Sequence, residues 1–220
     1  KLEAEIEEIK SNKIFENAFE WRFEFPEVLN DEGDFVGFDV VIGNPPYIRQ
    51  EELGEFKTHL SSIFKVFTSV GDIFSYFYEL SYNVMRENGY FSFINNTFDK
   101  TTAGKSLREF AVKNFSFIKY IDFTDVVVFE EATTYPIILI AKKNIHKNNF
   151  QFYKYTKTNF NDKEIIQNES NFTTVEQENL NSTVWNFINR FEQNILLKIQ
   201  AHKSLISQFG RCYRGILTGF

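Results

Sequence analysis

The 220-residue sequence has little of several features that define common protein classes. Its single cysteine, Cys212, excludes an internal disulfide framework and suggests a reducing, cytoplasmic setting. No run approaches the roughly 18 apolar residues that a membrane-spanning helix needs, so no membrane association is expected. The three histidines, His59, His146 and His202, are scattered without zinc-ligand spacing. We therefore expect neither a structural metal nor a disulfide-stabilised fold.

The sequence also lacks an excess of positive charge. Its formal net charge is -6, which argues against a chain that grips a phosphate backbone by bulk electrostatics. Any contact with nucleic acid must be local or come from residues outside this sequence. The sequence starts with Lys1 and stops after YRGILTGF without a polar tail, so we expect a piece of a longer protein.

Apolar strands and amphipathic helices alternate along the chain. Helices are predicted at about 1–16, 72–87 and 101–114, and strands at 37–43, 90–95, 117–123 and 135–141. The second helix should stop at Asn88-Gly89, a favourable helix C-cap pair. This alternation predicts an α/β fold with a mostly parallel sheet and flanking helices that cover both faces.

One motif lies where such folds place their functional sites. The run GFDVVIGNPPY puts Asn44, Pro45, Pro46 and Tyr47 directly after the 37–43 strand. Sites in open α/β sheets form at the carboxyl ends of the strands. Each proline has a fixed φ and a carbonyl but no N–H donor, so the loop keeps one shape. It can hold the Asn44 amide oxygen, the Pro45 carbonyl and the Tyr47 ring in fixed positions.

The NPPY tetrapeptide resembles the catalytic loop of amino-group methyltransferases that use S-adenosylmethionine. The resemblance implies that Asn44 and the Pro45 carbonyl accept hydrogen bonds from the target amine, while Tyr47 stacks on the base. It implies no strong base, because two aligned acceptors favour the pyramidal amine whose lone pair points at the methyl group. A plain turn remains the alternative for an isolated NPPY.

Further stretches resemble restriction–modification proteins that combine adenine methylation with cleavage. These are FEWRFEFPEVL upstream, GDIFSYFYELSYNVMRENGYFSFINN and the run from Ser106 to Lys143 downstream, and YRGILTGF at the end. The implied substrate is double-stranded DNA with an adenine flipped out of the stack. A methyltransferase for protein glutamine or an RNA base, and a non-catalytic binding module, remain alternatives.

The resemblance assigns roles to two more residues. Phe129 would form the second wall around the flipped adenine, with a core position as the alternative. Asp72 matches a polar residue that lines the cofactor pocket, with a helix N-cap as the alternative. Asn95, Asn96 and Thr97 follow a strand and either rim the pocket or form a turn. The basic, aromatic run KKNIHKNNFQFYKYTK is interpreted as an exposed edge strand rather than a DNA contact.

The main cofactor-binding motif of the family is missing upstream of the catalytic loop. The family uses a Gly-containing loop and an acidic residue there, yet Gly33 is the only glycine in residues 1–36. We therefore divide the chain into a lead-in helix and linker (1–36), the catalytic half of a Rossmann-like methyltransferase domain without its first strands (37–143), and an extension toward a target-recognition domain (144–220). The isolated chain should be inactive, and its exposed sheet edge could self-associate.

Overall fold

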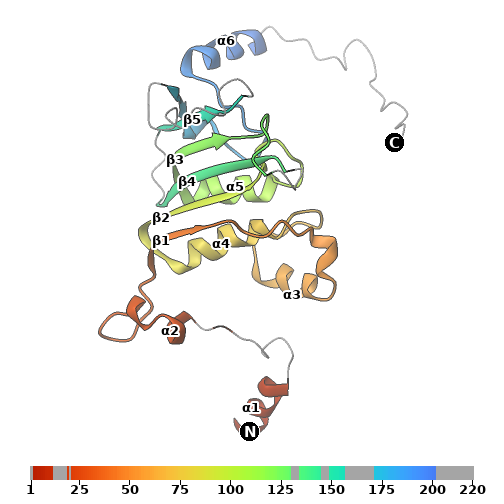
Figure 1. Cartoon of the computed structure of the whole chain (residues 1–220), viewed down its shortest axis with the longest axis vertical. Coiled ribbons are helices and arrows are strands. Elements are labelled where there is room, and N and C mark those ends of the chain that lie inside the picture. The colour runs from red at the N-terminus through yellow and green to blue at the C-terminus, as the bar shows by residue number, and fades with distance from the viewer. Residues whose placement is uncertain are drawn as a thin grey trace, which may run out of the picture.

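The computed structural model describes residues 2–11, 19, 21–129, 134–144, 149–156 and 171–201. Along the described chain the elements alternate as Figure 1 shows: α1 (Leu2–Ser11), α2 (Trp21–Glu24), β1 (Phe38–Gly43), α3 (Phe56–Ile63), α4 (Phe74–Val84), β2 (Met85–Asn96), α5 (Lys105–Asn114), β3 (Phe115–Asp122), β4 (Pro136–Lys143), β5 (Asn149–Lys154), β6 (Thr173–Glu176) and α6 (Arg190–Ala201). Short 3-10 turns occur at Pro26–Val28, Gln50–Leu53 and Gln177–Asn179. The predicted α/β class is confirmed.

Six strands form one sheet in the order β1-β2-β4-β3-β5-β6. Strands β1, β2, β3 and β5 share one direction, while β4 and β6 run against them. The predicted 135–141 strand therefore exists as β4, but it lies antiparallel between β2 and β3. Because four strands point the same way, the carboxyl ends of β1, β2, β3 and β5 meet at one edge of the sheet.

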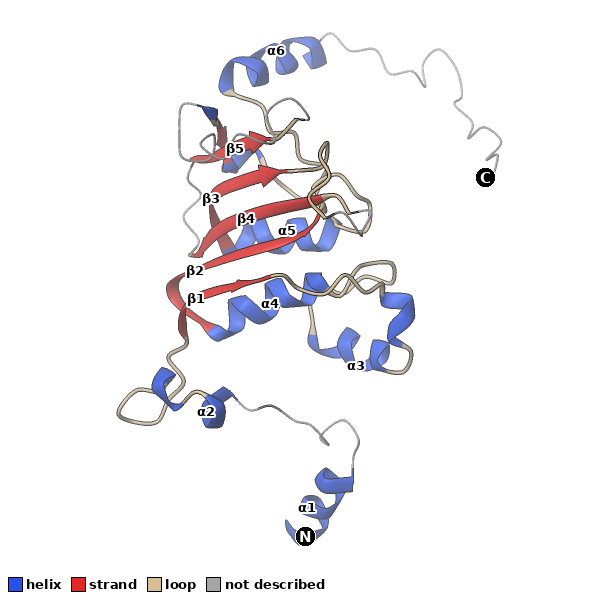
Figure 2. Cartoon of the chain, in the orientation of Figure 1, coloured by secondary structure: helices blue, strands red, loops and turns tan. Residues whose placement is uncertain are grey.

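Helices α4 and α5 pack together on one face of the sheet, as Figure 2 shows. Their apolar residues join Phe91, Phe93 and Leu139 in the main core. The expectation that helices cover both faces is wrong for the described residues, because both crossovers proceed in the same direction along the sheet and so fall on the same side. On the opposite face the side chains of Val40, Ile42 and Tyr90 are exposed.

The pair Asn88-Gly89 does not end a helix. Helix α4 stops at Val84, and β2 starts at once with Met85. Asn88 has a φ of 63°, and the pairing of β1 with β2 shifts register between Phe38 and Val40. The pair therefore forms a bulge in β2. This bulge requires a left-handed backbone conformation, which Asn and Gly adopt more readily than other residues. Both a helix C-terminus and a strand bulge favour Asn-Gly, so sequence alone assigned the pair to the wrong one of the two.

The expected edge strand in the basic, aromatic run lies inside the sheet. Strand β5 pairs with β3 on one side and with β6 on the other. Its Lys154 is held by Asp125 at 2.9 Å rather than being freely solvated. This correction follows from β6, whose short TTVE sequence gave no clear strand signal. Residues 145–148, within the basic run, lie outside the described part of the chain.

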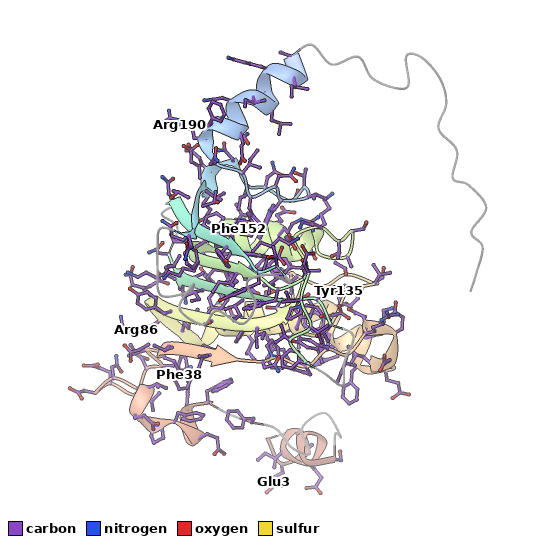
Figure 3. All side chains as sticks on the ribbon, turned by 45° about the horizontal axis from the view of Figure 1, so that its top comes forward. Glu3, Phe38, Arg86, Tyr135, Phe152 and Arg190 are labelled. Carbon is purple, nitrogen blue, oxygen red and sulfur yellow. The ribbon has the colours of Figure 1, made fainter. Side chains whose placement is uncertain are left out.

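An aromatic cluster attaches the lead-in segment to the start of β1. The rings of Trp21 and Phe25 lie 5.6 and 5.2 Å from that of Phe38, and Phe35 lies 6.3 Å from it. Such edge-to-face pairs contribute about 0.5–1.5 kcal/mol each beyond their buried area. The FEWRFEFPEVL segment thus fixes where β1 begins. Phe38 is labelled in Figure 3.

Of the three histidines and the cysteine, only His59 lies among the described residues. His59 lies on α3, whereas His146, His202 and Cys212 fall outside the described residues. Across the part of the chain that the structure describes, no three His, Cys, Asp or Glu side chains gather to hold a metal ion. Nor does any described helix have the length and apolar character to cross a membrane.

Candidate functional site

The NPPY motif stands at the carboxyl end of β1, as expected from its position after an apolar strand. Strand β1 pairs with β2 up to Gly43, and the extended ladder stops there because neither Pro45 nor Pro46 can donate a hydrogen bond. Pro45 is buried, while Asn44 and Pro46 are exposed. The loop is thus anchored through its first proline and presents the Asn44 carboxamide to solvent.

Tyr47 lies against both neighbouring strand ends. Its hydroxyl donates a hydrogen bond of 2.8 Å to Asn44 Oδ1 and lies 3.4 Å from the carbonyl oxygen of Ile94 in β2. Burial raises the pKa of Tyr47 above its usual value, so the hydroxyl stays protonated at neutral pH and remains a donor. The two functional side chains of the motif are therefore brought together and tied to β2.

The residues after Tyr47 are attached to the segment before α4. The Ile73 amide donates to the Ile48 carbonyl at 2.9 Å, and the Gln50 amide donates to the Gly71 carbonyl at 3.0 Å. These two bonds flank a single antiparallel bridge between Arg49 and Asp72. The NPPY loop is consequently held at both ends, by β1 before it and by the segment that leads into α4 after it.

Asp72 does not cap helix α4. Ile73 occupies the N-cap position, and no side chain there forms a capping hydrogen bond. Burial raises the pKa of the Asp72 carboxyl, and Glu51 adds to that rise, while the nearby positive charge of Arg49 opposes it. The alternative interpretation of Asp72 as an N-cap is therefore wrong. Its carboxyl group lies beside the residues that follow the NPPY motif.

The polar residues at the end of β2 form a connected network rather than a free pocket rim. Asn95 is fully buried, accepts a 2.7 Å hydrogen bond from the Tyr78 hydroxyl and donates to the Asn96 carbonyl. The Thr97 amide donates to the Tyr135 carbonyl at 2.9 Å. This bond extends the antiparallel pairing of β2 and β4 by one residue beyond Asn96 and Pro136; Tyr135 is labelled in Figure 3. The network fixes the β2 end against which Tyr47 rests.

Phe129 lies in the middle of the 123–135 loop that joins β3 to β4. Its side chain is partly exposed and is absent from both buried clusters, whereas the preceding Val128 packs on the smaller cluster of Ile121, Phe123 and Val126. Residues 130–133, which follow Phe129, lie outside the described chain. Phe129 is therefore only partly buried, whereas the alternative interpretation placed it in the core. Its role as the second wall around the flipped adenine stays a prediction.

The described residues fit only the reacting end of a site for S-adenosylmethionine. Asn44 and Asp72 lie on the two segments that the Arg49–Asp72 bridge joins. The described residues before β1 form α1, α2 and a 3-10 turn, and they include no glycine-containing strand–loop–helix unit that could cradle the main body of the cofactor. Gly33 sits in an open turn closed by its own amide on the Asn30 carbonyl at 3.0 Å. Strand β1 is an edge of the sheet. The binding of the cofactor's main body is thus not assigned to any described residue.

Three residues important to this geometry were missed from sequence. Gln50, Tyr76 and Tyr78 are buried, and the Tyr76 hydroxyl donates to Gln50 Oε1 at 2.6 Å. The two tyrosines follow the apolar periodicity of α4 and look like core residues. Gln50 could have been singled out only by its burial directly after the exposed Arg49, and burial at one loop position has no sequence pattern.

Comparison with known proteins places these residues in a family. Residues 1–129 match the Eco57I restriction-modification methylase family. The type II restriction enzyme and methyltransferase RM.Eco57I of Escherichia coli is 32% identical over 179 residues, which are 76% of this chain and 17% of that protein. The type II methyltransferase M.HincII of Haemophilus influenzae is 36% identical over 115 residues, 49% of this chain and 23% of that one.

Among solved structures, the type IIG restriction endonuclease BpuSI aligns with 74% of this chain and 22% of its own, at 18% identity and a TM-score of 0.49. The chain thus spans about a fifth of the length of the relatives it matches. Since the family match takes in residues 1–129, more than half of the 220, the chain belongs to the Eco57I restriction-modification methylases.

Proposed function

We propose that this chain supplies the catalytic loop of a DNA adenine-N6 methyltransferase from a restriction–modification system. The observation that carries the proposal is the pairing of Asn44 and Tyr47 at the carboxyl end of β1, joined at 2.8 Å and held against β2. The whole protein would act on double-stranded DNA with the target adenine flipped out. Family membership supports methylation, and the loop geometry supports an exocyclic amine as the acceptor of the methyl group.

The chemistry needs acceptors rather than a base. The lone pair of the adenine amine is delocalised into the ring, which makes it a poor nucleophile. Asn44 Oδ1 and the Pro45 carbonyl each accept a hydrogen bond from one N–H of the amine, and this favours the pyramidal amine with its lone pair aimed away from the two acceptors. Such preorganised acceptors are worth a few kcal/mol each in the transition state. When bound, S-adenosylmethionine supplies the methyl group.

Two aromatic side chains would hold the flipped base. The Tyr47 ring lies beside Asn44 and offers a stacking face, and Phe129 would close the opposite side. Stacking of a base on an aromatic side chain is worth about 1–3 kcal/mol and replaces part of the stacking that the adenine loses in the duplex. The negative net charge of -6 implies that residues beyond these 220 contribute most of the phosphate contacts.

Methyl transfer to DNA tests the proposal directly. The natural full-length polypeptide that contains this chain is incubated with labelled S-adenosylmethionine and mixed-sequence duplex DNA, and the digested nucleosides are separated. We expect label in N6-methyladenine. Label in RNA or on a protein glutamine, with none in DNA, would assign the same loop to another substrate. No transfer to any of the three would favour a non-catalytic binding module.

Truncation of the Tyr47 ring should weaken capture of the flipped base. Tyr47→Ala is expected to lower methyl transfer and base flipping by about 10- to 100-fold, since it removes the stacking face. Tyr47→Phe should stay within about fivefold, because it keeps the ring and loses one hydrogen bond. Fluorescence of 2-aminopurine at the target position measures flipping. Tyr90→Ala, which changes an exposed tyrosine in the middle of β2, is the control; equal losses in Tyr47→Ala and Tyr90→Ala would contradict the role.

The free edge of the sheet should make the isolated chain self-associate. Val40 and Ile42 of β1 are 58% and 79% exposed, and β1 pairs on one side only. An unpaired strand with exposed apolar residues is a template for another strand. Size-exclusion chromatography should show an apparent mass that rises with concentration, and Ile42→Lys should restore the monomer while Ile63→Lys on α3 should not. A monomer at every concentration would argue against this surface.

A further inference from the structure

We propose that Gln50 is a positioning residue for the catalytic loop, acting through its buried hydrogen bond to Tyr76 on helix α4. This inference rests on the proposed function, because it concerns how the Asn44–Tyr47 pair is held for methyl transfer. Within the NPPY tetrapeptide, the Tyr47 hydroxyl bonds to Asn44 and to Ile94 of β2 rather than to α4. The connection is made three residues after Tyr47, where Gln50 is only 1% exposed.

The geometry around Gln50 makes it the deepest anchor on the carboxyl side of the loop. Its backbone amide donates to the Gly71 carbonyl at 3.0 Å, and its side-chain oxygen accepts from the Tyr76 hydroxyl at 2.6 Å. The neighbouring Ile48 and Arg49 are exposed. The residues between Tyr47 and Gln50 therefore contribute little burial of their own, and the position of this segment depends on directional bonds to Gly71, Ile73 and Tyr76.

Helix α4 also fixes the other surface against which Tyr47 rests. The Tyr78 hydroxyl donates to Asn95 Oδ1 at 2.7 Å, and Asn95 follows Ile94, whose carbonyl oxygen lies 3.4 Å from the Tyr47 hydroxyl. Two tyrosines of one helix thus set the two sides of the Tyr47 position. A shift of the loop tail would alter the distance from Asn44 and Tyr47 to the end of β2.

Fold stability alone does not explain an amide at this position. The Nε2 atom of Gln50 is buried and has no hydrogen-bond partner among the described residues. A buried unsatisfied donor destabilises a fold, whereas replacing both members of a buried hydrogen bond by apolar groups of similar shape is close to neutral. A leucine facing a phenylalanine would fill the same space without that cost. What the Gln50–Tyr76 pair adds is a directional contact.

The test combines loop anchoring, stability and catalysis. Arg49 lies inside the anchored segment, so trypsin cuts the Arg49–Gln50 bond only when the segment opens. In the 220-residue chain, Tyr76→Phe should speed this cleavage about tenfold, since one buried bond no longer opposes opening. Tyr82→Phe is the matched control, because it makes the same change on α4 at a ring that packs on Phe110 and Phe115. Unchanged cleavage in Tyr76→Phe would overturn the proposal.

The catalytic arm uses the natural full-length polypeptide. Tyr76→Phe and the double variant Gln50→Leu/Tyr76→Phe should each lower the single-turnover methylation rate about tenfold, with an unaltered Kd for DNA. The thermal midpoint of the double variant should equal or exceed that of the unaltered protein. A double variant that regains the full rate would overturn the proposal, because burial rather than the hydrogen bond would then position the loop.

The two arms separate failure of this inference from failure of the proposed function. If the unaltered protein transfers no methyl group while Tyr76→Phe still accelerates cleavage at Arg49, the proposed function is wrong. The positioning role is then wrong as well, and the Gln50–Tyr76 hydrogen bond is only a structural contact. If methyl transfer occurs and only the Tyr76 and Gln50 variants lose rate and anchoring, both stand.

Discussion

Replacement of Asn44 by alanine should reduce methyl transfer to DNA by about a thousandfold or more. Loss of one preorganised hydrogen-bonding group at a reacting centre typically costs 10²–10³ in rate, and Asn44→Ala also frees Tyr47 from its 2.8 Å bond to the carboxamide. Because the missing interaction acts on the amine in the transition state, the rate constant should fall and the Kd for DNA should stay nearly constant. Single-turnover transfer of labelled methyl measures the first, and fluorescence anisotropy of labelled DNA measures the second.

Two further variants are compared with Asn44→Ala. Asn44→Asp keeps two acceptor oxygens for the amine and for the Tyr47 hydroxyl, so its rate should lie between those of the unaltered protein and Asn44→Ala. Asn83→Ala, an exposed asparagine on α4 near the opposite end of the sheet, should retain full activity. Since Asn44 is exposed, its replacement should change the free energy of unfolding by about 0.5 kcal/mol or less. A methylation rate in Asn44→Ala within tenfold of the unaltered protein would rule out the proposed acceptor role.

Among substitutions that add one methyl group in the segment before β1, Gly37→Ala should be the most destabilising. Gly37 has a φ of +100°, and a Cβ placed on it would lie 2.6 Å from the Arg86 nitrogen and 2.8 Å from the Val84 carbonyl oxygen. These are backbone atoms at the junction of α4 and β2, which cannot move aside as a side-chain tip would. Left-handed strain and overpacking together should cost about 3 kcal/mol or more.

Gly33 provides a matched control for that experiment. It also has a positive φ, of +82°, but an added Cβ would meet nothing within 4 Å. Gly33→Ala should therefore show only the conformational term, about 1 kcal/mol. For a chain of this length, the thermal midpoint should fall by about 10 °C for Gly37→Ala and by about 3 °C for Gly33→Ala. Equal shifts would mean that the β1 start relaxes away from the α4–β2 junction and that the clash is not realised.

Most local elements followed from the sequence because their signals are local. The helical spacing of Ile73, Phe77, Leu80 and Val84 identified α4, and the apolar run before Asn44 identified β1 within one residue. The Asn-Pro-Pro run of the NPPY loop restricts the backbone in the same way wherever it follows a strand. Errors occurred where one local preference serves two structures, as at Asn88-Gly89, which supports either a helix end or a strand bulge.

The spatial order of the strands could not be obtained this way. Strand β4 inserts between β2 and β3 and runs against both, although it follows β3 in the chain. Nothing in PIILIAKK distinguishes a parallel from an antiparallel neighbour, because both bury its apolar side chains. The same limit made β5 an expected edge strand, when β6, from residues far along the chain, covers it.

The sequence by itself determined that a rigid NPPY loop ends an apolar strand of an α/β fold, because proline geometry and apolar periodicity act within a few residues. Only the tertiary structure decided that Tyr47 meets Asn44 and Ile94, that Gln50 is anchored on Tyr76, and that Asp72 faces the loop instead of capping α4. Each of these latter features depends on side chains reaching across packed elements. Their energies depend on burial and distance, and both are set when β1, β2 and α4 pack together.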